Sequence, residues 1–225
     1  MVLIQQGSGD AAEMLRTTEP VWRRWCERWG LRREVYFGRV DLAATRNPLW
    51  DKMALTMQAL HREGEGEVVL WVDADALVVD VTQDPREVLP AGACAGMVYR
   101  KTAPEHLCTG VMFLRVGAEA AALFARVWEY GPQGVGGPCA ALRKVGCRRG
   151  GDDEVMQLVG GRTTGEIPTS NQIVAIDPRW NVTPKYRRDA AGQTPIIYHW
   201  AGIPRTTVRR RLEESVAKVM REWPS

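Results

Sequence analysis

Histidine is scarce in this chain of 225 residues, and long apolar runs are absent. There are three histidines, and the five cysteines form no CxxC pair that would indicate a zinc site, so we expect reduced thiols. No stretch of about 18 apolar residues is available for a membrane span, and the amino terminus lacks the basic region and apolar core of a signal peptide. We therefore expect no membrane span and a cytoplasmic protein. No internal repeat is present.

The composition is that of an ordinary globular protein, with 45% apolar and 25% charged residues. A chain of this length is expected to form one large domain, or one domain with a small appended lobe, and to bury roughly 70% of its unfolded surface. The net charge is only +3, but arginines cluster at 148–149 and at 205–211. These clusters either face phosphates or form a solvated helix face. Nine tryptophans are unusual, and Trp22, Trp25 and Trp29 share one helical face, as core or groove-wall residues do.

The hydrophobic pattern predicts a single α/β domain over residues 1–225, with a Rossmann-like mixed sheet flanked by helices. Strands are expected at 2–6, 34–37, 68–72, 95–99, 111–114, 173–176 and 196–198. Helices are expected from Asp10, with Glu13 completing a capping box, then from 18 to 29 with Pro20 in the first turn, from Pro48, at 119–130 and at 204–223. Residues 131–151 contain seven glycines and two prolines, which predicts a mobile loop or plain disorder.

Two acids one residue apart, Asp73 and Asp75, follow five consecutive apolar residues at 68–72. Such a run is typical of a strand buried on both faces, and open α/β sheets bind ligands at the carboxyl ends of their strands. Side chains at i and i+2 of a strand point the same way, so both carboxylates can hold one divalent cation. The alternative is that the acids only polarise the strand end. The apolar or small residues at 76–79 indicate that the acids interrupt a segment that is otherwise buried. Unpaired buried charges are costly, so this setting favours a functional role for the two acids.

Several motifs in order resemble metal-dependent glycosyltransferases of the GT-A fold, and above all the yeast mannan and plant xyloglucan transferase family, with glycogenin-like relatives. Besides the Asp-x-Asp strand, these are Arg-Asn-Pro-Leu-Trp-Asp-Lys at 46–52, Cys-Thr-Gly-Val-Met-Phe-Leu at 108–114 and Tyr-His-Trp-Ala-Gly at 198–202. The likeness runs from about residue 2 to 205. Three departures are Cys108 in place of Asn, the segment 152–157, and the lack of a membrane anchor. The first two leave the acceptor open.

The resemblance implies transfer of a sugar from a nucleotide-sugar donor, foremost a UDP-sugar, to an acceptor hydroxyl with retention. It makes His199 the third ligand of a Mn²⁺ or Mg²⁺ ion held by Asp73 and Asp75. Asp152 is expected beside the reacting sugar, with Asp153 as the neighbour that could replace it, although both acids could instead cap a helix. The remaining donor-binding candidates are Gln6 for the base and ribose, Ala74 for the ribose, Arg205 or Lys52 for the diphosphate, and Arg46 and Gly202 from the matching motifs.

Two other classes of protein stay open. A haloacid-dehalogenase-like phosphatase also has a nucleophilic Asp-x-Asp at a strand end, and Asp152 and Asp153 could be its later acids. That motif normally lies on the first strand of its domain, and Leu77 stands where Thr or Val is usual. A nucleic-acid-binding module would use the arginine-rich carboxyl-terminal helix. A transferase acting on modified DNA bases would combine both ideas, whereas the main acceptor candidates are a glycan or a small molecule. The sequence makes no prediction of the oligomeric state.

Overall fold

The structure is a computed structural model that describes residues 1–40, 46, 48–100, 106–131, 155–156, 173–183 and 193–223. The candidate catalytic residues Asp152 and Asp153 lie outside these ranges, as does the predicted loop at 131–151 apart from Gly131. Within the described ranges, Cys26, Cys94 and Cys108 form no disulfide with one another.

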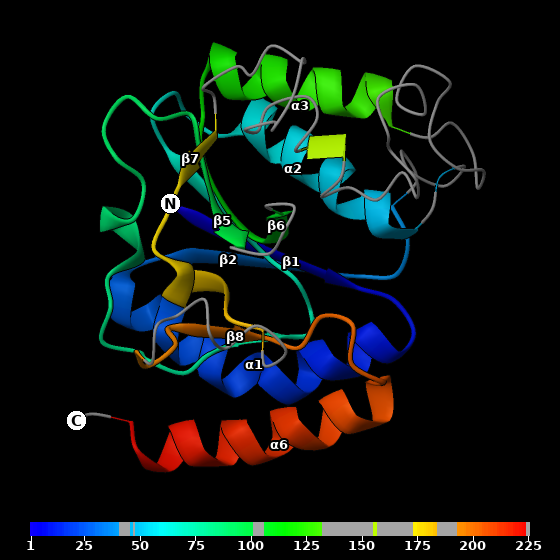
Figure 1. Cartoon of the computed structure of the whole chain (residues 1–225), viewed down its shortest axis with the longest axis vertical. Helices are drawn as coiled ribbons and strands as arrows, with labels where there is room; N and C mark the ends of the chain where they lie inside the picture. Colours follow the sequence, from blue (N-terminus) through cyan, green and yellow to red (C-terminus); the bar gives the residue numbers. More distant parts are fainter. Residues whose placement is uncertain are drawn as a thin grey trace.

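A six-stranded mixed sheet forms the centre of the molecule, in the order β2-β1-β3-β6-β5-β7 (Figure 1). Strand β1 pairs in parallel with β2 and β3, β6 runs antiparallel to β3 and β5, and β7 is parallel to β5. The strands are β1 Val2–Gly7, β2 Arg32–Phe37, β3 Val68–Val72, β5 Ala95–Arg100, β6 His106–Arg115 and β7 Ile173–Ala175. The predicted mixed α/β fold is confirmed, and β6 begins earlier than the predicted 111–114.

Helices cover both faces of this sheet (Figure 1). Helices α2 (Asp51–Arg62) and α3 (Ala118–Tyr130) lie on one face, and α1 (Asp10–Trp29) and α6 (Arg205–Arg221) lie on the other. Each face of the sheet packs against its helices in a separate hydrophobic core, and alternate residues of β3 belong to different cores. Val69 and Trp71 pack toward α2 and α3, whereas Leu70 and Val72 pack toward α1 and α6. Because both faces are buried, β3 is apolar throughout, as its sequence predicts.

Helix α1 is one continuous element, so the prediction of two helices separated near Pro20 is wrong. Proline inside a helix removes a backbone hydrogen bond and costs about 3 kcal/mol. The apolar stripe continues across Pro20, and Trp22 and Trp25 beyond it are fully buried with their rings edge to face at 5.5 Å. Burial of these aromatic residues outweighs the local cost.

The capping box predicted at the start of α1 is also wrong. Gly9 is the N-cap residue, and no side chain caps the helix. Glu13 instead forms an ion pair with Arg16 on the exposed surface. Asp10 lies in the first turn, where a negative charge is favoured by the helix dipole.

A second, two-stranded sheet lies beside the carboxyl end of β3. It consists of β4 (Ala76–Val78) and β8 (Ile197–His199), which run antiparallel with Ala76 opposite His199. The indole of Trp22 in α1 donates a hydrogen bond to the carbonyl of Ala76 at 3.3 Å. The chain therefore leaves the main sheet after Val72 and enters a second buried strand, so the two acids lie in the turn between two apolar segments.

The predicted carboxyl-terminal amphipathic helix is present as α6, which packs against α1 through Val208, Leu212 and Val219. Two short 3-10 segments, η2 (Pro48–Trp50) and η4 (Pro178–Asn181), precede α2 and β8 respectively, and a third, η3 (Pro85–Glu87), precedes β5. Within the described ranges, no helix combines the length and the apolar character that crossing a bilayer requires.

Candidate metal site

A tight turn presents the two acids at the edge of the sheet. The main-chain N–H of Asp73 donates to the carbonyl of Gly110 on β6 at 2.9 Å, which continues the β3–β6 pairing by one residue. The N–H of Ala76 then donates to the carbonyl of Asp73 at 3.1 Å and closes the turn around Ala74, which is buried. Both carboxylates consequently lie between the main sheet and the β4–β8 sheet.

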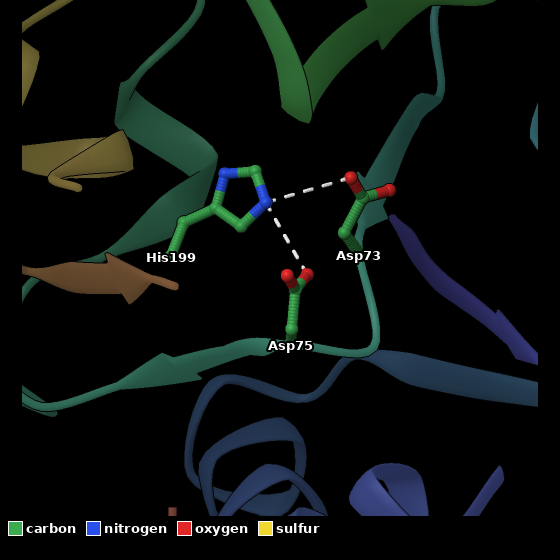
Figure 2. A group of neighbouring side chains, drawn as sticks. All are labelled: Asp73, Asp75 and His199. Atoms are coloured by element: carbon green, nitrogen blue, oxygen red, sulfur yellow. Dashed lines mark ion pairs between the residues drawn. The ribbon is translucent and has the colours of Figure 1, made fainter. Parts of the chain in front are cut away.

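His199 reaches the same place from the other end of the sequence. It is the last residue of β8, and its register opposite Ala76 brings it next to the turn. The N–H of Trp200 donates to the carbonyl of Asp75 at 3.0 Å, which ties the two segments together just beyond the β4–β8 pairing. Figure 2 shows the imidazole pointing toward both carboxylates.

The three predicted metal ligands converge. The Nε2 atom of His199 lies 3.2 Å from Oδ1 of Asp75 and 3.6 Å from Oδ2 of Asp73 (Figure 2). One ligand atom from each of the three residues lies within 4.8 Å of the others. The imidazole is buried, whereas the side chains of Asp73 and Asp75 are 23% and 29% exposed. The cluster is thus open to solvent on its carboxylate side.

The charges of this cluster support one another. Burial disfavours a charged imidazole, but the carboxylate of Asp75 and its hydrogen bond outweigh burial and raise the pKa of His199 well above 6.5. Burial likewise opposes ionisation of Asp75, and the positive charge of His199 lowers the pKa of that carboxyl below 3.8. In the metal-free protein, a proton on His199 therefore supplies the positive charge that the acids attract.

Lys52 in the first turn of α2 adds a second positive charge. Its Nζ lies 3.0 Å from Oδ1 of Asp73, and it donates to Thr109 Oγ1 at 3.5 Å. The indole N–H of Trp71 donates to the same Asp73 carboxylate at 2.7 Å. Lys52 is buried and Asp73 is 23% exposed, so the ion pair is shielded from water on the lysine side only. The structure thus places Lys52 beside a predicted metal ligand.

Two of the other candidates lie near strands: Gln6 is near the carboxyl end of β1, and Gly202 is in the turn that follows β8. The amide of Gln6 donates to the carbonyl of Gly38 at 2.5 Å and to Asp51 Oδ2 at 3.3 Å, which links the end of β1 to the turn after β2 and to the start of α2. Gly202 adopts a positive φ of 72° in the turn between β8 and α6. A left-handed conformation of this kind favours glycine.

The two candidate arginines contact other groups. Arg46 is buried, its guanidinium lies 3.8 Å from the centre of the Trp128 ring, and it donates to the Trp128 carbonyl at 2.9 Å. Arg205 is exposed at the start of α6 and pairs with Asp10 at 3.2 Å. Among the described residues, neither arginine contacts the acid and histidine cluster. Their roles toward a donor stay predictions.

Gly110 and Asn181 help to build the site, and the sequence gives no physical reason to select either for it. A Cβ atom on Gly110 would lie 2.1 Å from Cε1 of His199, so only glycine leaves room for the imidazole. Asn181, at the end of η4, places its Oδ1 3.0 Å from Nδ1 of His199. Gly110 lies within the motif at 108–114, whereas Asn181 lies in no motif. A single asparagine after a tryptophan is too common to indicate a site.

Similar structures define the fold. A glycosyltransferase involved in glycosylation of the major capsid of PBCV-1 superposes with a TM-score of 0.68 at 15% identity, covering 95% of this chain and 98% of that one. The galactosyltransferase LgtC, solved with donor and acceptor sugar analogs, gives 0.61 at 12% identity, with 97% and 96% covered. Mouse xyloside xylosyltransferase 1 gives 0.51 at 12% identity, with 90% and 98% covered.

These likenesses extend over nearly the whole chain, and at such low identity they establish the fold alone. The protein has the fold of the GT-A glycosyltransferases, with an Asp-Asp-His cluster beside the end of strand β3. No model of a known protein family matches the sequence, and no curated protein matches it.

Proposed function

We propose that the protein is a metal-dependent glycosyltransferase that moves a sugar from a nucleotide-sugar donor, foremost a UDP-sugar, to an acceptor hydroxyl. The observation that supports this most is the convergence of Asp73, Asp75 and His199 within 4.8 Å in a GT-A fold. The cluster is built from two distant parts of the chain, and it lies just beyond the carboxyl end of β3, at the edge where α/β sheets bind ligands.

The residues of the cluster fit a hard divalent cation. Two carboxylate oxygens and one imidazole nitrogen suit Mn²⁺ or Mg²⁺, and the exposed side of the carboxylates leaves room for phosphate oxygens. Within the described ranges no cysteine belongs to the cluster, whereas structural zinc sites are commonly rich in cysteine. A bound ion of this kind stabilises the negative charge of a diphosphate leaving group without proton transfer.

The chain's own residues supply the rest of the donor site. Lys52 holds Asp73 in an ion pair, and we assign its positive charge to the stabilisation of the leaving diphosphate. Gln6 and the backbone of Ala74 are assigned to the base and ribose. We keep Arg205 as a further diphosphate contact and Arg46 and Gly202 as donor-site residues, although in this structure Arg205 pairs with Asp10 and Arg46 packs on Trp128.

The finer assignments follow from the motifs. Membership of the yeast mannan and plant xyloglucan transferase family, retention at the anomeric carbon, and Asp152 or Asp153 beside the reacting sugar all rest on that resemblance. In this scheme the acceptor attacks the donor from the face of the leaving group, and the departing phosphate accepts the acceptor's proton. A glycan or a small molecule is the proposed acceptor, with a modified DNA base as the less favoured class.

A nucleotide-release assay tests this function. The purified protein is incubated with UDP-sugars and GDP-sugars and Mn²⁺, and the free nucleoside diphosphate is measured without acceptor. We expect slow release from at least one UDP-sugar, abolished by a chelator and by Asp75→Asn. No release from any donor, with hydrolysis of an aryl phosphate instead, would establish the phosphatase. Salt-dependent DNA binding with no turnover would establish the nucleic-acid module.

A further inference from the structure

Asn181 is a buried amide between two groups of the site. Its Oδ1 lies 3.0 Å from Nδ1 of His199, and its Nδ2 lies 3.5 Å from the carbonyl oxygen of Cys108. Only 3% of the residue is exposed to solvent. It therefore lies behind the imidazole, on the side opposite the two carboxylates.

The Cys108 carbonyl determines which way the amide faces. A carbonyl oxygen only accepts hydrogen bonds, so the amide end that faces it must be the NH₂ group. The oxygen of Asn181 is then the end that faces His199. An oxygen accepts, so Nδ1 of His199 has to be the donor and must hold a proton. When the ring is neutral, the lone pair is then on Nε2, the atom that faces Asp73 and Asp75.

We propose that Asn181 is the positioning residue of the metal site, holding His199 in the Nδ1–H tautomer so that Nε2 is free to bind the cation. The inference rests on the proposed metal-dependent function. Ligating histidines commonly donate their second ring N–H to an acceptor, and loss of that acceptor typically lowers metal affinity about 10–100-fold.

Main-chain contacts hold Asn181 in this position. The next residue, Val182, accepts a hydrogen bond from the N–H of His199 at 2.9 Å, and its own N–H donates to the carbonyl of Ile197 at 3.0 Å. The end of η4 is thus fastened to β8 by main-chain hydrogen bonds at Ile197 and at His199 itself. The absence of a side chain at Gly110 lets the imidazole lie close to β6.

Without Asn181, the surroundings of the His199 ring would favour the Nε2–H tautomer. The Cys108 thiol also lies near Nδ1, but its sulfur is 3.9 Å away and is a weak acceptor. The Nε2–H tautomer would donate to Asp75 at 3.2 Å, a much better partner. That tautomer has no lone pair toward the cation.

Imidazole ¹⁵N NMR and Mn²⁺ titration calorimetry on the full chain test this role. The three histidines make the spectrum easy to assign. Asn181→Leu removes the acceptor, Asn181→Asp keeps it, and Thr183→Val is the matched control. Thr183 is a buried neighbour whose hydroxyl has no hydrogen-bond partner among the described residues. Thermal melts check that each variant is folded.

At a pH where the ring is neutral, the metal-free wild type is expected to show Nδ1–H. Asn181→Leu should shift His199 toward Nε2–H and weaken Mn²⁺ binding about 10–100-fold. Asn181→Asp should restore the tautomer, and Thr183→Val should change neither quantity.

An Nε2–H tautomer in the wild type, or an unchanged tautomer and affinity in Asn181→Leu, would overturn the inference. The tautomer of His199 in the wild type can be measured even if a variant fails to fold. Failure of the wild type to bind Mn²⁺, with Nδ1–H still dependent on Asn181, would instead overturn the metal-dependent function and leave the tautomer assignment supported.

Discussion

The two sides of the candidate metal site are constructed differently. The acidic side, Asp73 and Asp75, comes from one short turn after β3, and its charge is balanced by Lys52. The histidine side consists of His199 and the groups that hold it, which come from β6, η4 and β8. On the acidic side, two acids close together in the sequence provide negative charge. On the histidine side, residues far apart in the sequence together position one atom, Nε2 of His199.

This difference separates two kinds of damage. A substitution on the acidic side removes charge that attracts the cation, and the fold changes little because both acids are partly exposed. A substitution on the histidine side displaces the ring within a packed interior, so it affects metal binding and stability together. The predictions below test this contrast in order of decreasing effect.

Neutralising Asp75 is expected to have the largest effect on function. Asp75→Asn keeps the size of the side chain but removes the charge and one ligand oxygen. Mn²⁺ affinity should fall more than the 10–100-fold that is typical for loss of an outer partner, and donor turnover should be abolished. Titration calorimetry and nucleotide release measure both. Asp10→Asn, an acid on the exposed surface, is the matched control and should retain both. Metal binding at the wild-type level in Asp75→Asn would remove Asp75 from the site.

A methyl group on Gly110 should damage the histidine side. In Gly110→Ala the Cβ would lie 2.1 Å from the ring of His199, so the ring must move. We expect a loss of about 1–3 kcal/mol in the free energy of unfolding, the usual cost of overpacking, together with weaker Mn²⁺ binding.

Gly117→Ala provides the control for Gly110→Ala, because a Cβ at that position meets nothing within 4 Å. Denaturant unfolding and calorimetry compare the two variants. Equal stability and equal metal affinity in both would show that the imidazole is not held against β6.

The pH dependence of the metal-free protein separates the two sides by their charge. The pKa of His199 is raised, so its stabilising charge is fully present below pH 6.5 and is lost as the pH rises through the higher folded value. The pKa of Asp75 is lowered, so its contribution is present above pH 3.8 and is lost as the pH falls through the lower folded value. Melting temperatures of the wild type and His199→Gln, measured without metal, should therefore differ most between these two pH values.

Mn²⁺ should reverse this trend. A cation binds the neutral imidazole, so the rise in melting temperature that Mn²⁺ produces should increase as the pH is raised. His199→Gln should lose that pH dependence. A Mn²⁺ shift that is independent of pH in the wild type would indicate that His199 is not a ligand.

The smallest effect on stability is expected for Arg205→Ala. Arg205 and Asp10 form an ion pair on the surface, and exposed pairs of this kind contribute at most about 1 kcal/mol. Urea unfolding of Arg205→Ala should therefore lie close to the wild type. If Arg205 also binds the donor diphosphate, nucleotide release should fall in Arg205→Ala while Asp10→Asn keeps it. Equal turnover in both variants would leave Arg205 a surface residue.

The contrast between the two sides also explains what could be predicted from the sequence. Asp73 and Asp75 lie one residue apart after an apolar strand, so their closeness is predictable from the sequence, although a turn rather than strand alternation brings both carboxylates to one place. His199 is predictable only through a resemblance, because its approach depends on the β4–β8 register. The contacts of Gly110 and Asn181 depend on how β6 and η4 pack around the ring. No spacing rule contains that information.

Helix α1 shows the same limit in the fold. A Thr-Glu-Pro sequence is a good local signal for a helix start, and it predicts a break before Pro20. The structure has no break, because Trp22 and Trp25 extend an apolar stripe that is buried against the sheet and β4. The local sequence is compatible with one continuous helix or with two helices that break before Pro20. Tertiary packing decides between them, and the sequence pattern alone does not give the strength of that packing.

Titration of the metal-free protein with Mn²⁺, followed by calorimetry, tests the central claim most directly. We expect saturable binding of one ion per chain, lost alike in Asp73→Asn, Asp75→Asn and His199→Gln, and retained in Asp10→Asn. Absence of saturable binding in the wild type, or binding that survives each of the three substitutions, would contradict a shared cation held by these side chains.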